Sequence, residues 1–140
     1  MIYALDTNII SFLLRPGRNQ DVVRQFEKMI EQGDDYVIPA IAYYEIMWYL
    51  LRKKATGQLR VFERLYRNAC VEIRMGEADF LLAARIKANL VKQGIPLGDK
   101  DADILISACC MANDYTLVTD NVSDFERIEG LKFVNWKNRG

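Results

Sequence analysis

The residues best suited to chemistry in this chain are acidic, because the chain contains no histidine. Without histidine, the Ser-His-Asp and Cys-His mechanisms and the paired-histidine zinc sites are excluded. Asp6 and Asp120 each follow a short apolar segment, and Glu45 is the only charged residue between Val37 and Leu51. Any chemistry must therefore rest on carboxylates, lysine, tyrosine or a metal bound by oxygen.

Each of these carboxylates also has a purely structural interpretation. Asp6 could cap a helix, although Thr7 could do so equally well, and Asp120 with Asn121 could form an Asx turn. Glu45 could form one buried salt bridge with an arginine. An unpaired carboxylate in such apolar surroundings costs several kcal/mol, so we expect Glu45 to have a cation, a network of hydrogen bonds or a raised pKa.

Three further acidic residues open an apolar segment, 99–113, that is predicted to be a buried helix. Acidic residues in the first turn of a helix are stabilised by the helix dipole, but one carboxylate is enough for that effect. Asp99 and Asp103 share one helical face, whereas Asp101 points roughly the opposite way. Asp103 is followed directly by Ile104-Leu105-Ile106, so it most needs a compensating charge.

Short apolar segments alternate with helical patterns along the chain, and this alternation predicts the fold class. The predicted strands cover residues 1–5, 36–38, 70–73, 116–118 and 133–134, and the predicted helices 9–14, 20–32, 40–54, 58–68, 77–93, 99–113 and 121–126. The pattern predicts one α/β domain over residues 1–140, with a short parallel sheet of about five strands and helices on both faces. Because ligands bind at the carboxyl ends of such strands, Asp6 and Asp120 are expected at one edge.

Several carboxylates without histidine or thiolate spacing favour a hard cation, chiefly Mg²⁺ or Mn²⁺. Carboxylates gathered at one sheet edge would repel one another unless a cation lay between them. The chain has no EF-hand loop pattern and no glycine-rich phosphate loop of either common type. We therefore expect a carboxylate-held magnesium or manganese site, with no organic cofactor.

The formal charge is zero, with 19 basic and 19 acidic residues, so any binding of nucleic acid must use a local patch. Residues 52–67 hold six basic residues against one acid, Glu63. This segment is a candidate RNA-binding surface, with interleaved aromatic residues that could stack on bases, or else a solvated helix face whose aromatic residues lie in the core or a dimer contact. The RNA-binding candidates are Arg52, Lys53, Arg60 and Arg64, and the interleaved aromatic residues are Tyr49, Phe62 and Tyr66.

The three cysteines include the adjacent pair Cys109 and Cys110, which we interpret as small core residues in a reducing compartment. The first residues lack the pattern of a signal peptide, and no apolar stretch reaches the length of a membrane span. We expect a cytoplasmic protein that does not contact the membrane.

These acidic residues lie in segments that, in this order, resemble the PIN-domain ribonucleases, and among them the VapC-like toxins of prokaryotic toxin–antitoxin pairs. The resemblance extends over essentially the whole chain. The matching segments are Ala4-Leu5-Asp6-Thr7-Asn8, Glu45, Ile95-Pro96-Leu97-Gly98, residues 103–108, residues 116–121, residues 124–127 and Gly130-Leu131, ending near Trp136.

The resemblance implies a doubly wound α/β fold with four acidic positions around Mg²⁺ or Mn²⁺. Asp6, Glu45 and Asp103 match the first three positions, and Asn121 matches the fourth, where Asp120 beside it is an alternative. The residues expected in supporting roles, orienting carboxylates or water, are Thr7 and Thr119, with Asp101 as a further candidate.

The expected activity is that of an endoribonuclease that uses a metal-activated water to hydrolyse RNA phosphodiesters, which would leave 5′-phosphate and 3′-hydroxyl ends. Asp6 and Asp103 would be the main metal ligands. Glu45 would bind through water or act as general base, and Asn121 or Asp120 would hold the water or a second metal.

The partners that the resemblance implies are a second copy of the chain and a small antitoxin whose C-terminal segment covers the active site. One alternative is a non-catalytic PIN-like module that binds RNA or protein. Two others are a phosphoacceptor receiver domain, for which only Asp6 fits the required acidic pair, and a small-molecule phosphohydrolase.

Overall fold

A parallel sheet forms the centre of the protein, which a computed structural model describes over residues 1–71 and 74–138. Within these residues the sheet has four strands in the order β2-β1-β3-β4. Its two central strands are buried, as expected of a parallel sheet that is covered on both faces. The strands are β1 (Ile2–Leu5), β2 (Asp35–Val37), β3 (Thr116–Val118) and β4 (Phe133–Val134).

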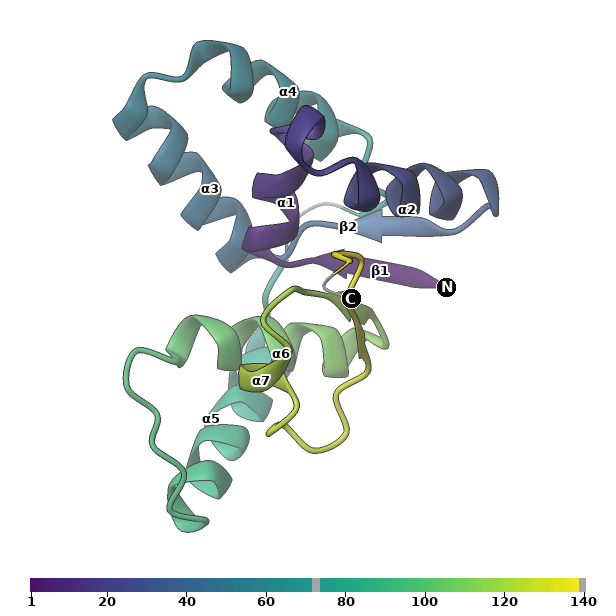
Figure 1. The fold of residues 1–140 in the computed structure, drawn as a ribbon. Helices are drawn as coiled ribbons and strands as arrows, with labels where there is room; N and C mark the ends of the chain where they lie inside the picture. Colours follow the sequence, from purple (N-terminus) through teal and green to yellow (C-terminus); the bar gives the residue numbers. More distant parts are fainter. Residues whose placement is uncertain (72–73, 139–140) are drawn as a thin grey trace.

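Helices cover both faces of this sheet. Figure 1 shows α1 to α4 on one side of the sheet and α5 to α7 on the other. A 3₁₀ turn, η1 (Pro16–Arg18), joins the first two helices at the Pro-Gly step. The helices are α1 (Thr7–Leu13), α2 (Gln20–Glu31), α3 (Ala40–Lys53), α4 (Thr56–Arg67), α5 (Glu77–Lys92), α6 (Asp101–Asn113) and α7 (Val122–Phe125). The predicted α/β fold, with helices on both faces of a parallel sheet, is therefore confirmed.

The strand expected over residues 70–73 is the one element that differs from the prediction. Glu72 and Ile73 lie outside the described residues, and Cys70 and Val71 form a bend. The Cys70 amide nevertheless donates a hydrogen bond to the carbonyl oxygen of Tyr36, at 3.0 Å, along the outer edge of β2. Four strands, rather than about five, are thus present in the part of the chain that the structure describes.

The strand register fixes which residues leave the sheet together. Leu5 of β1 lies opposite Val118 of β3. One residue further along, the Asp6 amide donates to the Val118 carbonyl oxygen and the Thr119 amide donates to that of Val134, both at 3.0 Å. Asp6 and Thr119 therefore emerge side by side at the carboxyl edge of the sheet.

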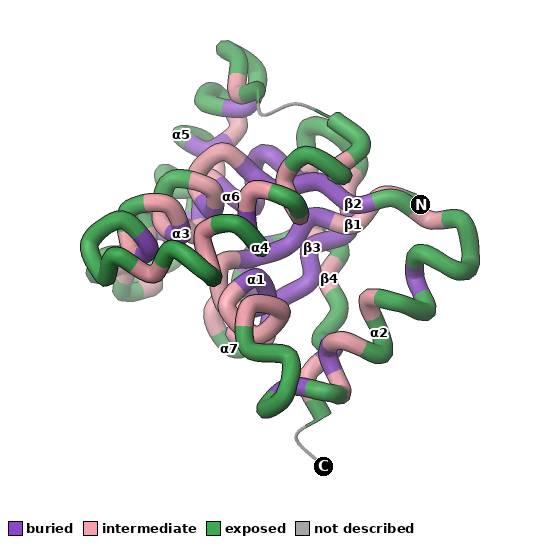
Figure 2. The backbone as a smooth tube through the Cα atoms, turned by 90° about the horizontal axis from the view of Figure 1, so that it is seen from above, coloured by how far each residue is buried: buried purple, intermediate pink, exposed green. Residues whose placement is uncertain are grey.

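The main core lies between the sheet and the inner faces of its helices. The buried segments meet around β1 and β3, while the outer turns of the helices are exposed (Figure 2). Helix α3 is apolar on nearly all sides, yet its buried residues Ala42, Ile46 and Leu50 recur every four positions on one face. Cys109 and Cys110 are buried in α6, as predicted, and burial raises the pKa of both thiols, that of Cys109 to about 11. None of the helices in the described residues has both the length and the hydrophobicity needed to cross a membrane.

Candidate active site

Asp6 caps helix α1 at the carboxyl edge of the sheet, so its predicted capping role is confirmed. Its Oδ1 accepts a hydrogen bond from the Thr7 amide at 2.8 Å, and its Oδ2 accepts one from Thr119 Oγ1 at 2.7 Å. The side chain is only 5 % exposed. Burial raises the pKa of Asp6, the hydrogen bonds from Thr119 and Thr7 oppose that rise, and the charge of Glu45 adds to it.

Thr119 links Asp6 to the loop that follows β3. Its fully buried hydroxyl oxygen accepts hydrogen bonds from the Asn121 amide, at 3.0 Å, and from Asn8 Nδ2, at 3.5 Å. The Asp120 amide donates to Asn8 Oδ1 at 3.2 Å. Because the oxygen of Thr119 already accepts from nitrogen donors, its single hydrogen is directed to Asp6.

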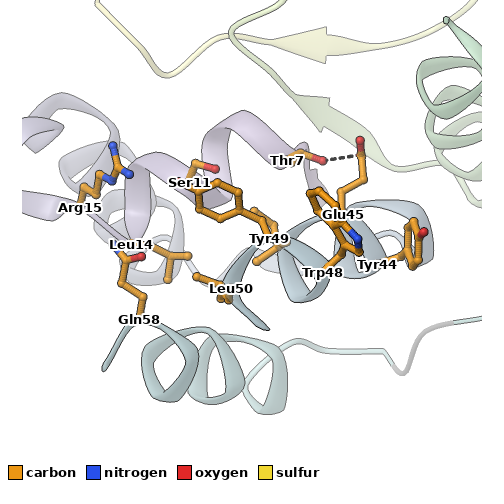
Figure 3. Close-up of a pocket in the computed structure, with 11 residues that line it drawn as sticks. Thr7, Ser11, Leu14, Arg15, Tyr44, Glu45, Trp48, Tyr49, Leu50 and Gln58 are labelled. Carbon is orange, nitrogen blue, oxygen red and sulfur yellow. Dashed lines mark hydrogen bonds between the residues drawn. The ribbon is translucent and has the colours of Figure 1, made fainter. Parts of the chain in front are cut away.

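Glu45 is connected to the same centre through Thr7, whose hydroxyl donates to Glu45 Oε1 at 2.8 Å (Figure 3). The expectation of a deeply buried Glu45 is wrong. The side chain is half-buried, because its neighbours Tyr44 and Trp48 lie on the outer face of α3 and are 65 % and 54 % exposed. No ion pair neutralises Glu45 among the residues that the structure describes.

Asp103 lies in the first turn of α6 and experiences the charge of the other carboxylates. Burial, followed by the negative charge of Asp6, raises the pKa of Asp103 to about 6. The ammonium group of Lys100 opposes this rise, and the charges of Asp124 and Glu45 add to it. Asp6, Glu45, Asp103 and Asp124 thus lie near enough to repel one another, although they come from four separate segments.

Asp124 belongs to this group but is missing from the candidates chosen by sequence. Its Oδ2 accepts hydrogen bonds from Lys100 Nζ and from Asn121 Nδ2, both at 2.6 Å. The hydrogen bond from Lys100, and next that from Asn121, lowers the pKa of Asp124. The signal that could have found it is spacing, because Asn121 at the N-cap and Asp124 at the third position of a short helix, α7, form a natural pair.

Asp101 lies apart from this centre. It is exposed and accepts a hydrogen bond from Lys87 of α5 at 2.8 Å, in agreement with its predicted opposite face. Asp101 is therefore not supported in the role of orienting carboxylates or water. Asp120 accepts a hydrogen bond from Asn135 through Oδ1 at 3.2 Å.

The donor set fits a hydrated divalent cation better than a cage of direct ligands. Within the described residues, no three acidic or thiol side chains are close enough together to hold a metal ion among them. Mg²⁺, however, commonly binds through one or two carboxylates and keeps several waters. Burial and the charge of Glu45 raise the pKa of Asp6, and burial and the charge of Asp6 raise that of Asp103, so these two groups gain most from such an ion.

Two of the aromatic residues that were candidates for stacking on RNA bases in the basic segment of α3 and α4 instead lie in the core. Phe62 is fully buried and Tyr66 packs against Tyr43 with ring centroids 5.0 Å apart, so the core interpretation applies to both. On α3, the guanidinium of Arg52 lies 5.0 Å from the ring centroid of Trp48. The aromatic groups of α3 outside this packing include Tyr49, which was among the interleaved residues, and the exposed Trp48, which was not.

The comparison with known proteins agrees with this architecture. The PIN domain model matches residues 3–131, and the chain belongs to this family. Among its relatives, ribonuclease VapC1 of Haemophilus influenzae (strain Rd) is 30 % identical over 138 residues, covering 97 % of this chain and 98 % of the relative. Ribonuclease VapC2 of Rickettsia felis is 24 % identical over 136 residues, covering 97 % and 98 %.

Solved structures give the same answer for the fold. VapBC-1 from nontypeable Haemophilus influenzae matches with a TM-score of 0.75 and 29 % identity, covering 97 % of this chain and 98 % of that one. VapBC2 from Rickettsia felis, bound to a DNA fragment from its promoter, matches with a TM-score of 0.82 and 23 % identity, covering 98 % and 100 %.

Proposed function

We propose that this protein is a divalent-metal-dependent endoribonuclease of the VapC kind, acting in the cytoplasm as the toxin of a toxin–antitoxin pair. The observation that carries the proposal is the convergence of Asp6, Glu45 and Asp103 at one sheet edge, where Lys100 pairs with Asp124 and not with any of these three. Relatives that match over nearly their whole length are named ribonucleases, which supports the reaction class.

Mg²⁺ or Mn²⁺ is the proposed cofactor, because the available donors are oxygen atoms of carboxylates and an amide. Asp6 and Asp103 would hold the ion directly, and Glu45 would do so through water. Asn121, with Asp124 beside it, is the proposed fourth position. When bound, such an ion lowers the pKa of an attacking water and stabilises negative charge on the phosphoryl oxygens.

The residues of the chain supply orientation and proton transfer. Thr7 and Thr119 fix both oxygens of Asp6, so this carboxylate presents its remaining lone pairs in one direction. Glu45 is held through Oε1 by Thr7, and its other oxygen is the proposed acceptor for the proton of the attacking water. Because water attacks rather than the ribose 2′-hydroxyl, the products should carry 5′-phosphate and 3′-hydroxyl ends.

Lys100 is expected to change partners when the site is loaded. In the structure its ammonium group neutralises Asp124 from the first residue before α6. An approaching phosphodiester brings negative charge to the same place, and a lysine there contributes to its binding as a point charge. The lysine therefore offsets repulsion between RNA and the acidic cluster.

The proposed partners are RNA as substrate, an antitoxin that covers the acidic centre, and a second copy of the chain. The related solved structures from Haemophilus influenzae and Rickettsia felis are VapBC assemblies, which supports the antitoxin. The homodimer rests on the family resemblance.

The decisive experiment incubates purified protein with total RNA and Mg²⁺ or Mn²⁺, with EDTA as a control. Asp6→Asn and Asp103→Asn should abolish cleavage. Asp101→Asn is the matched control, because it makes the same chemical change on the same helix at an exposed residue paired with Lys87, and it should cut like the wild type.

The ends of the products supply a second criterion. Cleavage that persists in EDTA or in Asp6→Asn, or that leaves 2′,3′-cyclic phosphate, would contradict the proposed mechanism. A wild-type protein that binds RNA without cutting it under any metal condition would instead support the non-catalytic binding module.

A further inference from the structure

A groove of about 570 Å³ runs away from the candidate active site between α1, α3 and α4. Thr7 and Glu45 line one end, and Arg15 and Gln58 line the other (Figure 3). The groove therefore begins at a carboxylate of the acidic centre itself. A polymer that reaches Glu45 can therefore extend along the groove.

The wall formed by α3 carries the aromatic rings of Tyr44, Trp48 and Tyr49, and the last two are each paired with a cation. Trp48 lies one turn beyond Glu45 and has Arg52 stacked on it at 5.0 Å. Tyr49, also in the wall, has the ammonium group of Lys53 at 5.7 Å from its ring centroid. These pairs repeat at a spacing of four residues, so both cations lie on the turn that follows the rings.

The charge of the groove is suited to an anionic polymer. In the described residues, Glu45 and Arg15 are the charged side chains that line the groove, one at each end. Arg52 and Lys53 do not line it, but they lie over the rings of Trp48 and Tyr49 and so add two cations beside the aromatic surface. A flat ring surface between cations is what single-stranded nucleic acid requires, because bases stack on the rings while phosphates contact the cations.

We infer that this groove is a binding subsite for single-stranded RNA, in which a base next to the cleaved bond stacks on Trp48. Arg52, Lys53 and Arg15 contact the backbone phosphates. The inference rests on the proposed ribonuclease function, because the groove opens at Glu45. Arg52 lies about 10 Å along the helix axis from Glu45, at 1.5 Å per residue, which corresponds to roughly three stacked nucleotides at 3.4 Å each. A protein segment in the groove is the competing occupant, and the charges of the groove favour RNA.

Binding is measured first, with a labelled single-stranded oligoribonucleotide and the Asp6→Asn protein in EDTA, so that no cleavage occurs. Trp48→Ala should weaken binding by about 5- to 150-fold, the range expected for loss of one base–aromatic stack, and Trp48→Phe should restore most of it. Phe80→Ala on α5 is the matched control, since Phe80 is also an exposed aromatic residue but lies outside the groove, and it should bind like the parent protein.

The cations are tested with two pairs of substitutions that remove equal charge. Arg52→Gln with Lys53→Gln should weaken binding and reduce the slope of log K against log salt by about 1.4, as for two lost phosphate contacts on a single strand. Arg60→Gln with Arg64→Gln removes the same charge from α4, where Arg64 lines a different hollow, and should have less effect. Equal losses of RNA affinity in the two double variants would mean that binding depends on the overall charge of the protein, and would overturn the assigned RNA path.

Cleavage then separates this inference from the proposed function. In the wild-type background, Trp48→Ala should raise KM for a ten-nucleotide substrate by a similar factor, because a contact that binds the substrate is lost, whereas Phe80→Ala should leave KM unchanged. If the wild type cleaves RNA and Trp48→Ala changes neither binding nor KM, the ribonuclease stands and the RNA groove is refuted. If Trp48→Ala instead prevents only the assembly with a co-expressed antitoxin, the groove holds a protein segment and the inference is likewise overturned.

Discussion

Replacement of Asp103 by asparagine should make the metal-free protein more stable at neutral pH while it abolishes activity. In the described part of the chain no side chain donates a hydrogen bond to the Asp103 carboxylate, and the hydrogen bond with Ser107 uses the backbone carbonyl. The carboxylate is therefore held among Asp6, Glu45 and Asp124 without compensation from donors. Asparagine has almost the same shape and carries no charge, so it removes the repulsion without leaving a cavity.

The size of the expected gain in stability follows from the pKa of Asp103. A rise from 3.8 to about 6 corresponds to about 3 kcal/mol if it is expressed fully in folding, at about 1.4 kcal/mol per unit. Because the side chain is only partly buried, solvent screening reduces this to about 1–3 kcal/mol. For a domain of this length that is a rise in Tm of roughly 3–10 °C.

The direction of the pKa shift of Asp103 determines how the stability difference between the two proteins changes with pH. A carboxyl group whose pKa is raised on folding favours the folded state below its unfolded pKa, and this contribution is lost as the pH rises through the folded value. The advantage of Asp103→Asn should therefore be largest at pH 7.5, fall through pH 6 and be small near pH 4. Groups that do not interact with Asp103 titrate alike in both proteins and cancel in the difference.

The assay is urea unfolding in EDTA at several pH values, repeated with Mn²⁺ added. Mn²⁺ should stabilise the wild type and have little effect on Asp103→Asn, because the ion needs this carboxylate. Asp101→Asn should lie within about 0.5 kcal/mol of the wild type throughout, since it is an exposed ion pair. An Asp103→Asn protein that is less stable than the wild type in EDTA at pH 7.5 would refute the reasoning.

Three further substitutions test the supporting contacts. Thr119→Val removes the hydroxyl that orients Asp6 and should reduce the affinity for Mn²⁺, measured by calorimetry, about 10- to 100-fold. Circular dichroism checks that the variant is folded, and unchanged affinity would mean that this hydrogen bond has no role at the metal. Asp79→Ala removes a buried carboxylate that accepts hydrogen bonds from the Gly76 amide and from Asn113. It should lower the free energy of unfolding, measured with urea, by about 1–3 kcal/mol, and an unchanged free energy would contradict this expectation. Asp21→Asn should speed amide hydrogen exchange in the C-terminal tail, because Asp21 accepts from the backbone there, and identical exchange rates would show that the tail is held by other contacts.

Much of the fold follows from local sequence signals. The segments over residues 116–118 and 133–134 are strands with the predicted bounds. Apart from the strand expected over residues 70–73, the other predicted helices and strands differ by only a few residues at their ends. These elements are short and bounded by glycine, proline or capping residues, so local preference and tertiary context agree. The opposite faces of Asp101 and Asp103 could likewise be predicted from helical periodicity alone.

The parts that could not be predicted depend on contacts between distant segments. Helix α3 is apolar on most sides, and only its packing against α1 and the sheet decides that Trp48 faces outward and that Glu45 lies at a rim. The inclusion of Asp124 depends on Lys100, which lies 24 positions away in sequence. Composition cannot say which face of such a helix is covered, because that depends on the shapes of its neighbours.

The hydroxyl of Thr119 has a consequence for how the site responds to acid. Its only hydrogen and the amide of Thr7 each occupy one lone pair on the two oxygens of Asp6, so an incoming proton and an incoming divalent ion must compete for those that are left. If Asp6 holds a divalent ion as proposed, acidification should therefore displace that ion directly, with no rearrangement of the chain, and activity lost below neutral pH should be restored by raising the metal concentration.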